Sequence, residues 1–216
     1  MDFCFRKAGM PLAAAGAVAL LAGFVAVAPA KAQQAAAGQA AAGQAPAKNW
    51  KDRAEYDLFT KITQTTDMKA RLELLNTWQD KYPQTDYSSE RLQYYIDTLS
   101  RLANSDPAQR QPLLTKCQEL LKVDPKNANA LFMISFWGQA VGGANPSPEL
   151  QSQVQSAAQA FVSGADEAFS PANKPKNLSD ADFQKAKNIR LAVAHNALAW
   201  VATAKKDNAT AETEYK

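Results

Sequence analysis

The C-terminal stretch of the chain, residues 191–216, constrains the fold more than any other part of the sequence. It reads LAVAHNALAWVATAKKDNATAETEYK, so apolar residues at helical spacing are followed by a short polar turn and then by a second helical stretch. Asp207 stands where an N-cap residue is expected, and Lys205 and Lys206 suit the negative end of the preceding helix. The pattern predicts a helical hairpin, and earlier parts of the chain repeat it.

Helical hairpins of the same kind are predicted along the rest of residues 50–216. Apolar residues recur every three or four positions over about residues 50–65, 67–82, 87–104, 106–123, 128–141, 147–168 and 180–204. The breaks between these segments carry caps or breakers, namely Asp67, Pro83, Asp106, glycines 142–143, Ser147, the loop 169–177 and Ser179. The chain is therefore predicted to be all-α.

The N-terminus has the pattern of a secretory signal peptide over residues 1–32. Arg6 and Lys7 precede an apolar stretch at 11–27, and residues 30–32 form a small-x-small cleavage site. We expect an exported protein, periplasmic or secreted. The alternative is that this segment stays uncleaved and serves as an N-terminal membrane anchor. We expect the segment to contact the membrane only in that case. Residues 33–49, rich in alanine, glycine and glutamine, are predicted to be a flexible linker.

Charge and cysteine content narrow the function classes. The net charge of +3 is too small to indicate nucleic-acid binding. Cys4 lies within the predicted signal, so Cys117 is left without a cysteine partner and is expected to pack as a small apolar residue. One histidine and one mature cysteine cannot supply a typical zinc site, and glycines 142–143 lack the lysine and the strand of a phosphate-binding loop. We expect no cofactor, metal or small-molecule substrate.

Several stretches resemble the tetratricopeptide-repeat family. Residues 123–127 (VDPKN) match the end of such a repeat, and residues 82–87 (YPQTDY) resemble a junction found in repeat proteins of the bacterial envelope. Ala157 and Phe161 have the spacing of a second repeat helix. The resemblance, over about residues 50–216, implies a right-handed superhelix (α-solenoid) of about four antiparallel helix pairs, the last one incomplete. The caps at 67, 106, 147 and 207 depart from a period of about 34 residues, so another antiparallel solenoid or bundle is the alternative.

The resemblance also implies where a partner would bind. The concave face of such a stack, lined by the first helix of each pair, takes an extended peptide or a helix of another protein. On that face we place Asn129, Phe132, Phe136, Asn196 and Trp200, although core packing is the alternative for the aromatic residues. The predicted function is a non-enzymatic protein–protein interaction scaffold of the bacterial cell envelope, with an unidentified protein partner. A structural spacer without a groove is a weaker alternative.

An enzymatic alternative rests on Cys117 and His195. These residues could form the thiol–imidazole pair of a thiol-dependent enzyme, or the chain could be a subunit of an envelope enzyme. Both residues fall on apolar helix faces, and no oxyanion-forming glycine loop accompanies them. A basic cluster near the long helix predicts a solvated face or, alternatively, contact with anionic lipid headgroups; it comprises Lys174, Lys176, Lys185, Lys187 and Arg190.

The final helix is predicted to begin near Asn208 and is short. The sequence stops about nine residues into it, and a helix of that length is marginal unless it is packed. We therefore expect either a fragment with further repeats downstream or a frayed end.

Overall fold

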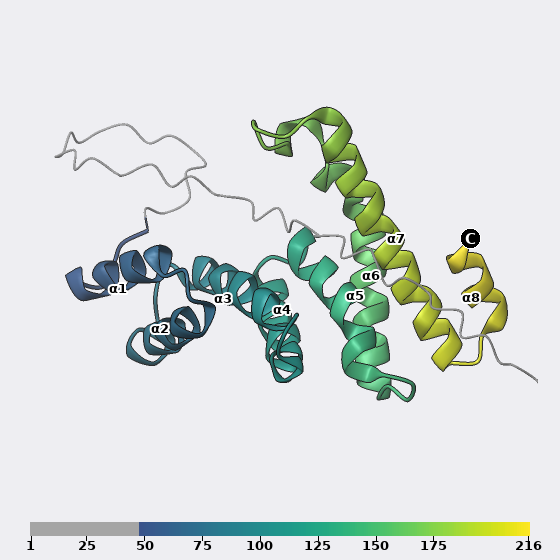
Figure 1. The fold of residues 1–216 in the computed structure, drawn as a ribbon, viewed down its shortest axis with the longest axis horizontal. Helices are drawn as coiled ribbons and strands as arrows, with labels where there is room; N and C mark the ends of the chain where they lie inside the picture. The colour runs from purple at the N-terminus through teal and green to yellow at the C-terminus, as the bar shows by residue number, and fades with distance from the viewer. Residues whose placement is uncertain (1–47) are drawn as a thin grey trace, which may run out of the picture. The chain divides into compact units, whose positions relative to one another are not determined.

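The computed structural model describes residues 48–216, and the regular structure within them is entirely helical (Figure 1). The prediction of an all-α fold is confirmed for this part of the chain. The predicted signal peptide (1–32) and the predicted linker up to residue 47 lie outside the described residues. The elements are α1 (Arg53–Gln64), α2 (Met68–Lys81), α3 (Ser88–Leu102), η1 (Pro107–Gln109), α4 (Arg110–Val123), α5 (Ala128–Gly142), α6 (Pro148–Ala168), η2 (Pro171–Asn173), α7 (Asp180–Ala204) and α8 (Asn208–Tyr215).

Side-chain caps set most of the helix starts. Asp67 accepts hydrogen bonds from backbone N–H groups in the first turn of α2, which would otherwise lack a partner. The same arrangement occurs at Asp106, Ser147, Ser179 and Asp207. These caps are confirmed, and the predicted helix boundaries lie close to the observed ones. The helix predicted from residue 106 differs in its first turn, because η1 is a 3-10 turn that precedes α4.

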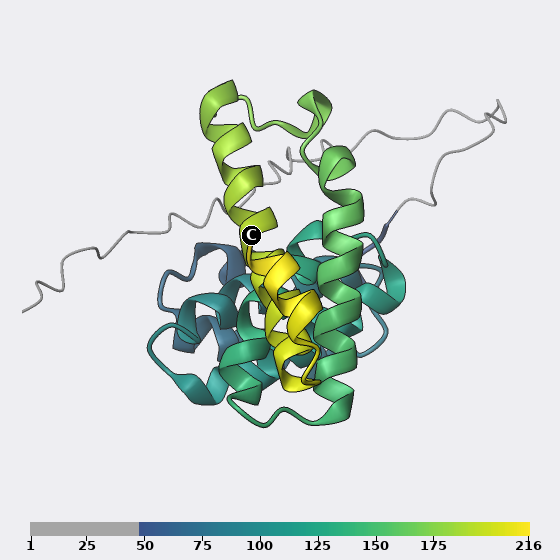
Figure 2. The ribbon, with the colours of Figure 1, turned by 90° about the vertical axis from the view of Figure 1, so that its right-hand side faces the viewer.

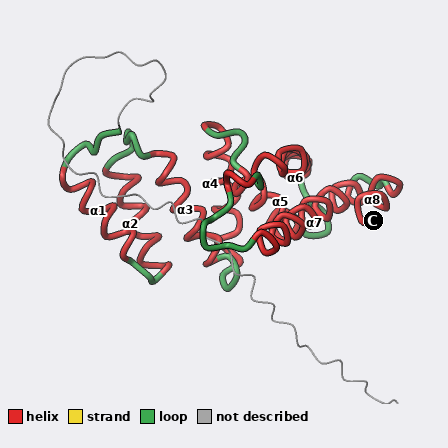
Figure 3. The backbone as a smooth tube through the Cα atoms, turned by 90° about the horizontal axis from the view of Figure 1, so that it is seen from above, coloured by secondary structure: helices red, strands yellow, loops and turns green. Residues whose placement is uncertain are grey.

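Each helix packs mainly on the helices next to it in the sequence, and α5 also packs on α7. Figures 2 and 3 show α6, α7 and α8 following one another as adjacent helices. The core consists of apolar side chains at these helix–helix contacts, and its largest fully buried members include Ile62, Trp78, Ile96, Leu113 and Phe161. All described residues belong to one compact unit.

The longest helix is α7, with 25 residues. At about 1.5 Å per residue it is about 37 Å long. Its first turns carry the charged residues Asp180, Asp182, Lys185 and Lys187, and its second half is largely buried. Across residues 48–216, no helix combines the length and the hydropathy that crossing a bilayer requires.

Candidate binding face on helix α5

Helix α5 has no charged residue in its 15 positions, ANALFMISFWGQAVG. It begins at the Asn127 cap and ends at Gly143, whose φ of +59° is a conformation that glycine adopts without strain. Helices α4, α6 and α7 pack around it. The contact with α6 is close, because a Cβ on Gly138 would lie 2.2 Å from Cγ2 of Val154. An uncharged helix packed in this way is expected to be buried.

Phe136 is the exception on this helix, since 44% of it is exposed. Its ring contacts two buried rings of the same helix, with centroids 5.9 Å from Phe132 and 4.9 Å from Trp137. A buried aromatic base therefore holds an exposed aromatic side chain in a fixed position. Asn129 lies seven positions earlier on the same side of α5 and is also exposed.

Two guanidinium groups extend this aromatic series. Cζ of Arg110 lies 5.1 Å from the ring centroid of Trp137, and Cζ of Arg190 lies 4.9 Å from that of Phe132. Arg190 also covers the ring of Phe169, at 5.6 Å. We call this series the aromatic–arginine row; it consists of Arg110, Trp137, Phe136, Phe132, Arg190 and Phe169. It joins residues from α4, α5, α7 and the end of α6 in one continuous series of contacts, in which Phe132 and Trp137 are buried and Phe136 is exposed.

The five residues predicted to line a groove divide into two groups. Asn129, Phe136 and Asn196 are exposed, as a binding surface requires, whereas Phe132 and Trp200 are buried. The indole N–H of Trp200 donates to the carbonyl of Gly143 at 3.1 Å. The prediction that Trp200 is accessible on a groove is thus wrong, because its ring packs under the α5–α6 turn. Phe132 contributes as the base beneath Phe136 and Arg190.

The proposed thiol–imidazole pair is not assembled. Cys117 is buried in α4, and burial raises the pKa of its thiol to about 12. Nδ1 of His195 lies 2.7 Å from Oε2 of Glu214 and so connects α7 to α8. Cys117 therefore sits in the core as expected, and no observed contact supports nucleophilic chemistry by this pair.

The basic cluster is partly neutralised by ion pairs. Lys174 pairs with Asp180, and Lys187 pairs with Asp166. Arg190 points its charge at aromatic rings. The ion pairs at Lys174 and Lys187 therefore weaken the positive potential of this cluster.

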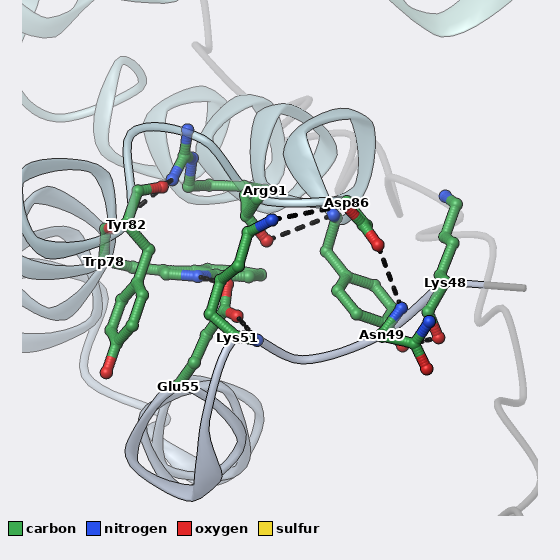
Figure 4. A network of polar contacts seen from close by, with 10 residues as sticks. Lys48, Asn49, Lys51, Glu55, Trp78, Tyr82, Asp86 and Arg91 are labelled. Carbon is green, nitrogen blue, oxygen red and sulfur yellow. Dashed lines mark hydrogen bonds and ion pairs between the residues drawn. The ribbon is translucent and has the colours of Figure 1, made fainter.

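A polar network at the opposite end of the described chain is shown in Figure 4. The Glu55 carboxylate is fully buried and accepts from the indole N–H of Trp78 at 2.8 Å and from the backbone N–H of Lys51 at 2.7 Å. Nη1 of Arg91 donates to the carbonyl of Tyr82 at 2.7 Å, and its guanidinium covers the ring of Trp78. These groups join α1, α2 and α3.

The segment just before α1 is held by the same region. The ring of Trp50 stacks on that of Tyr87, with centroids 3.7 Å apart, and Lys48 pairs with Glu90. The backbone N–H of Asn49 donates to Oδ2 of Asp86. Residues 48 and 49 therefore belong to the folded part, and the predicted linker 33–49 is two residues too long at its C-terminal end. Because the Glu55 and Arg91 charges are used internally, this network anchors the chain and presents no binding group.

Sequence reasoning missed this network, although one signal for it is present. Asp52 and Glu55 have the spacing of a capping box, and Asp52 does accept from the N–H of Glu55 at 2.8 Å. The long-range partners of Glu55 carry no such local signal.

One surface hollow of about 390 Å³ lies near the α5–α6 turn; it is lined by Gln111, Val141, Gly142, Asn145, Pro146, Ser147, Glu149, Leu150 and Gln153. Its one carboxylate is Glu149, in the first turn of α6. Hydrogen bonds from its own backbone N–H and from the Ser147 hydroxyl lower the pKa of that carboxyl. Glu149 thus acts in capping α6, and the hollow holds no group poised for catalysis. Within residues 48–216, no three His, Cys, Asp or Glu side chains gather as a metal site would require.

Comparison with protein-family models, with curated proteins and with solved structures found no match for the chain. The described residues thus define the class of the protein at the level of an all-α helical fold. The feature of these residues that bears on function is the aromatic–arginine row.

Proposed function

We propose that the protein is a non-enzymatic scaffold that binds a segment of a partner protein on the exposed face of α5. The observation that carries the proposal is Phe136, which is 44% exposed on a helix without a single charge. An exposed aromatic side chain on a rigid apolar base has the character of an interface anchor. Val123 at the end of α4 is also exposed, but it is not part of an aromatic series. Tyr56 is exposed and contacts the ring of Trp50, but it lies on α1, which carries several charged residues.

We further propose that the helices form a tetratricopeptide-type superhelix. The support is the succession of capped helices that pack on their sequence neighbours, and the turn at Asp124 that follows α4. In that arrangement α5 is the first helix of the third pair, and the first helices line the inner face. Placement in the bacterial cell envelope is supported by the N-terminal sequence pattern alone.

Site-specific photo-crosslinking in cells tests the proposal. A photoreactive phenylalanine analogue replaces Phe136 in the full-length chain, and the same analogue replaces Val123 as the matched control. Both positions are exposed, but only the first belongs to the aromatic–arginine row. The expected result is a discrete partner adduct from position 136 that is absent from position 123. Fractionation of the adduct between cytoplasm and envelope tests the compartment separately.

Equal adducts from both positions, or none from position 136, would contradict the binding role of the α5 face. The second outcome would favour a spacer. Circular dichroism of both variants checks that helix content is unchanged, so that a missing adduct is not the result of misfolding.

A further inference from the structure

Arg190 differs from the other arginines of the described residues. Three of those arginines pair with carboxylates, namely Arg53, Arg71 and Arg101. The other two, Arg91 and Arg110, donate to backbone carbonyls. Arg190 lies against the rings of Phe132 and Phe169, and within residues 48–216 its guanidinium has no hydrogen-bond or ion-pair partner. Its planar fork of five N–H donors therefore has no acceptor from the protein.

The surroundings of Arg190 make this arrangement costly. The side chain is half-buried, and burial lowers the pKa of its guanidinium because the charged form loses hydration. The two rings recover part of that loss through cation–π contact. Among the described residues, the side-chain nitrogens and oxygens that are both buried and without a partner are Nε of Arg71 and Oε2 of Glu90. The nitrogens of Arg190 also lack a partner but are not among these buried atoms, so solvent still reaches them. An incoming acceptor can therefore reach the fork.

The carboxylates at the end of α6 and at the start of α7 have other partners. On α6, Asp166 pairs with Lys187 and Glu167 pairs with Lys126. On α7, Asp180 pairs with Lys174, and Asp182 accepts a hydrogen bond from the Ser179 hydroxyl. Helix α5, on the other side of the guanidinium, has no carboxylate to offer. The positive charge of Arg190 lies over the ring of Phe132, which in turn contacts Phe136. This part of the chain does not neutralise that charge, so a complementary negative charge on a ligand would be favoured.

We propose that the α5 face takes an acidic segment of a partner protein, in which an Asp or Glu carboxylate pairs with Arg190 while an adjacent apolar side chain packs on Phe136. The inference rests on the proposed function and names the chemistry of its partner. Charge complementarity selects the carboxylate, since a guanidinium fork binds one through two parallel hydrogen bonds. The fixed series Phe136–Phe132–Arg190 sets the order of the apolar and acidic groups on the ligand.

Two other occupants fit less well. The chain's own residues 33–47 contain no Asp or Glu, so this segment cannot supply the carboxylate. A membrane of anionic lipid calls for several free cations together, yet two lysines of the basic cluster are already paired with carboxylates.

Selection from a displayed library of short random peptides, with the full-length chain as bait, tests the inference. The expected result is enrichment of peptides with Asp or Glu beside a large apolar residue. The leading peptide is then synthesised in two forms, with its acidic residue intact and with the corresponding amide, and fluorescence anisotropy measures both affinities. The parent chain should prefer the acidic form by about tenfold or more.

Variants assign that preference to Arg190. Arg190→Gln should bind both peptide forms equally, and Arg190→Lys should retain only part of the preference, because lysine keeps the charge without the fork. Arg53→Gln is the matched control, since it removes a guanidinium from the distant α1, and it should behave as the parent. Circular dichroism confirms that each variant is folded, and Arg190→Lys provides the test if Arg190→Gln is not.

The outcomes separate this inference from the proposed function. Peptides without acidic residues, or no peptides at all, would overturn the acidic partner; so would a preference for the acidic form that survives in Arg190→Gln. If peptides are selected, loss of their binding in Phe136→Ala would still support the binding role of α5, and binding unaffected by Phe136→Ala would contradict both proposals. If no peptide is selected, the photo-crosslinking at position 136 decides the proposed function. Binding of phosphatidylglycerol vesicles by the parent but not by Arg190→Gln would show that the ligand of Arg190 is an anionic lipid and would overturn the acidic protein partner.

Discussion

Single residues in this fold are held by partners that lie far away in the sequence. Glu55 is a charged residue with no exposed surface, and it connects α1 with Trp78 of α2 and with the chain before α1. A buried charge is tolerated when hydrogen bonds replace its hydration. The same rule explains Trp200, whose buried N–H donates to a turn carbonyl. Such residues therefore help to fix how neighbouring helices pack on each other.

Truncating Glu55 should therefore be costly. Glu55→Ala leaves the indole N–H of Trp78 buried without an acceptor and opens a cavity, so we expect a loss of about 2–4 kcal/mol in the free energy of unfolding. Glu55→Gln keeps the volume and one oxygen, and it should lose less. Urea unfolding followed by circular dichroism measures both. Asp57→Ala is the control, because it removes one partner of an exposed ion pair and should change stability by about 0.5 kcal/mol or less.

Cys117 provides a second test at this scale, and it concerns the enzymatic alternative. A thiol that is buried and has a pKa of about 12 is protonated at neutral pH and shielded from reagents. We expect negligible reaction with a thiol-specific chromogenic reagent in the native protein and complete reaction in denaturant. Rapid labelling of the native protein would instead revive a role for Cys117 in chemistry.

At the scale of the helix, close packing sets the limits of the candidate face. Helices α5 and α6 approach each other at Gly138, which lets Val154 lie against the backbone of α5. Further along α6, Gly164 has open space where a Cβ would be. The two glycines therefore serve different purposes, although both lie inside helices.

This difference gives a matched pair of substitutions. Gly138→Ala forces the new methyl group into Val154, so we expect a loss of about 1–3 kcal/mol, partly restored by the additional change Val154→Ala. Gly164→Ala meets nothing and should raise stability by about 0.4–1 kcal/mol, because alanine favours the helix. Thermal and urea unfolding measure both changes. A neutral Gly138→Ala would show that α5 and α6 pack less closely than the structure indicates.

Helix boundaries were predictable because their signals are local. The caps at Asp67, Asp106, Ser147 and Asp207 lie directly before the helices they start, so the sequence alone places them. The exposed side of α5 was less predictable. Because that helix is apolar nearly all round, its periodicity cannot tell exposed Phe136 from buried Phe132, and the same difficulty misplaced Trp200. Burial there depends on which neighbouring helices cover each side.

For the whole molecule, the capping carboxylates link stability to pH. The pKa values of Asp52, Asp106 and Asp207 lie below their ordinary value of 3.8, because each carboxylate accepts hydrogen bonds from the first turn of the helix it caps. The folded state therefore binds these protons more weakly than the unfolded state does. The resulting stabilisation is fully present above the ordinary pKa and is lost as the pH falls through the lowered values.

The predicted outcome is a melting temperature that is level at neutral pH and falls as the pH is lowered from about 5 to about 2. Differential scanning fluorimetry across that range measures it. The triple variant Asp52→Asn, Asp106→Asn, Asp207→Asn keeps a capping oxygen at each site but has no proton to gain there. Its melting temperature should fall less steeply with acid than that of the parent. Identical slopes would mean that other groups control the acid response.

The anchoring of residues 48–50 also has a mechanical consequence. These residues contact Glu90, Asp86 and Tyr87, which lie at or next to the start of α3, before the chain continues into α1. Trp50 also contacts the rings of Tyr56 and Phe59 on α1. Tension applied through the upstream chain is therefore shared between α3 and α1. Because part of the load is taken by residues at the start of α3, the contacts between α1 and α2 do not have to resist it alone.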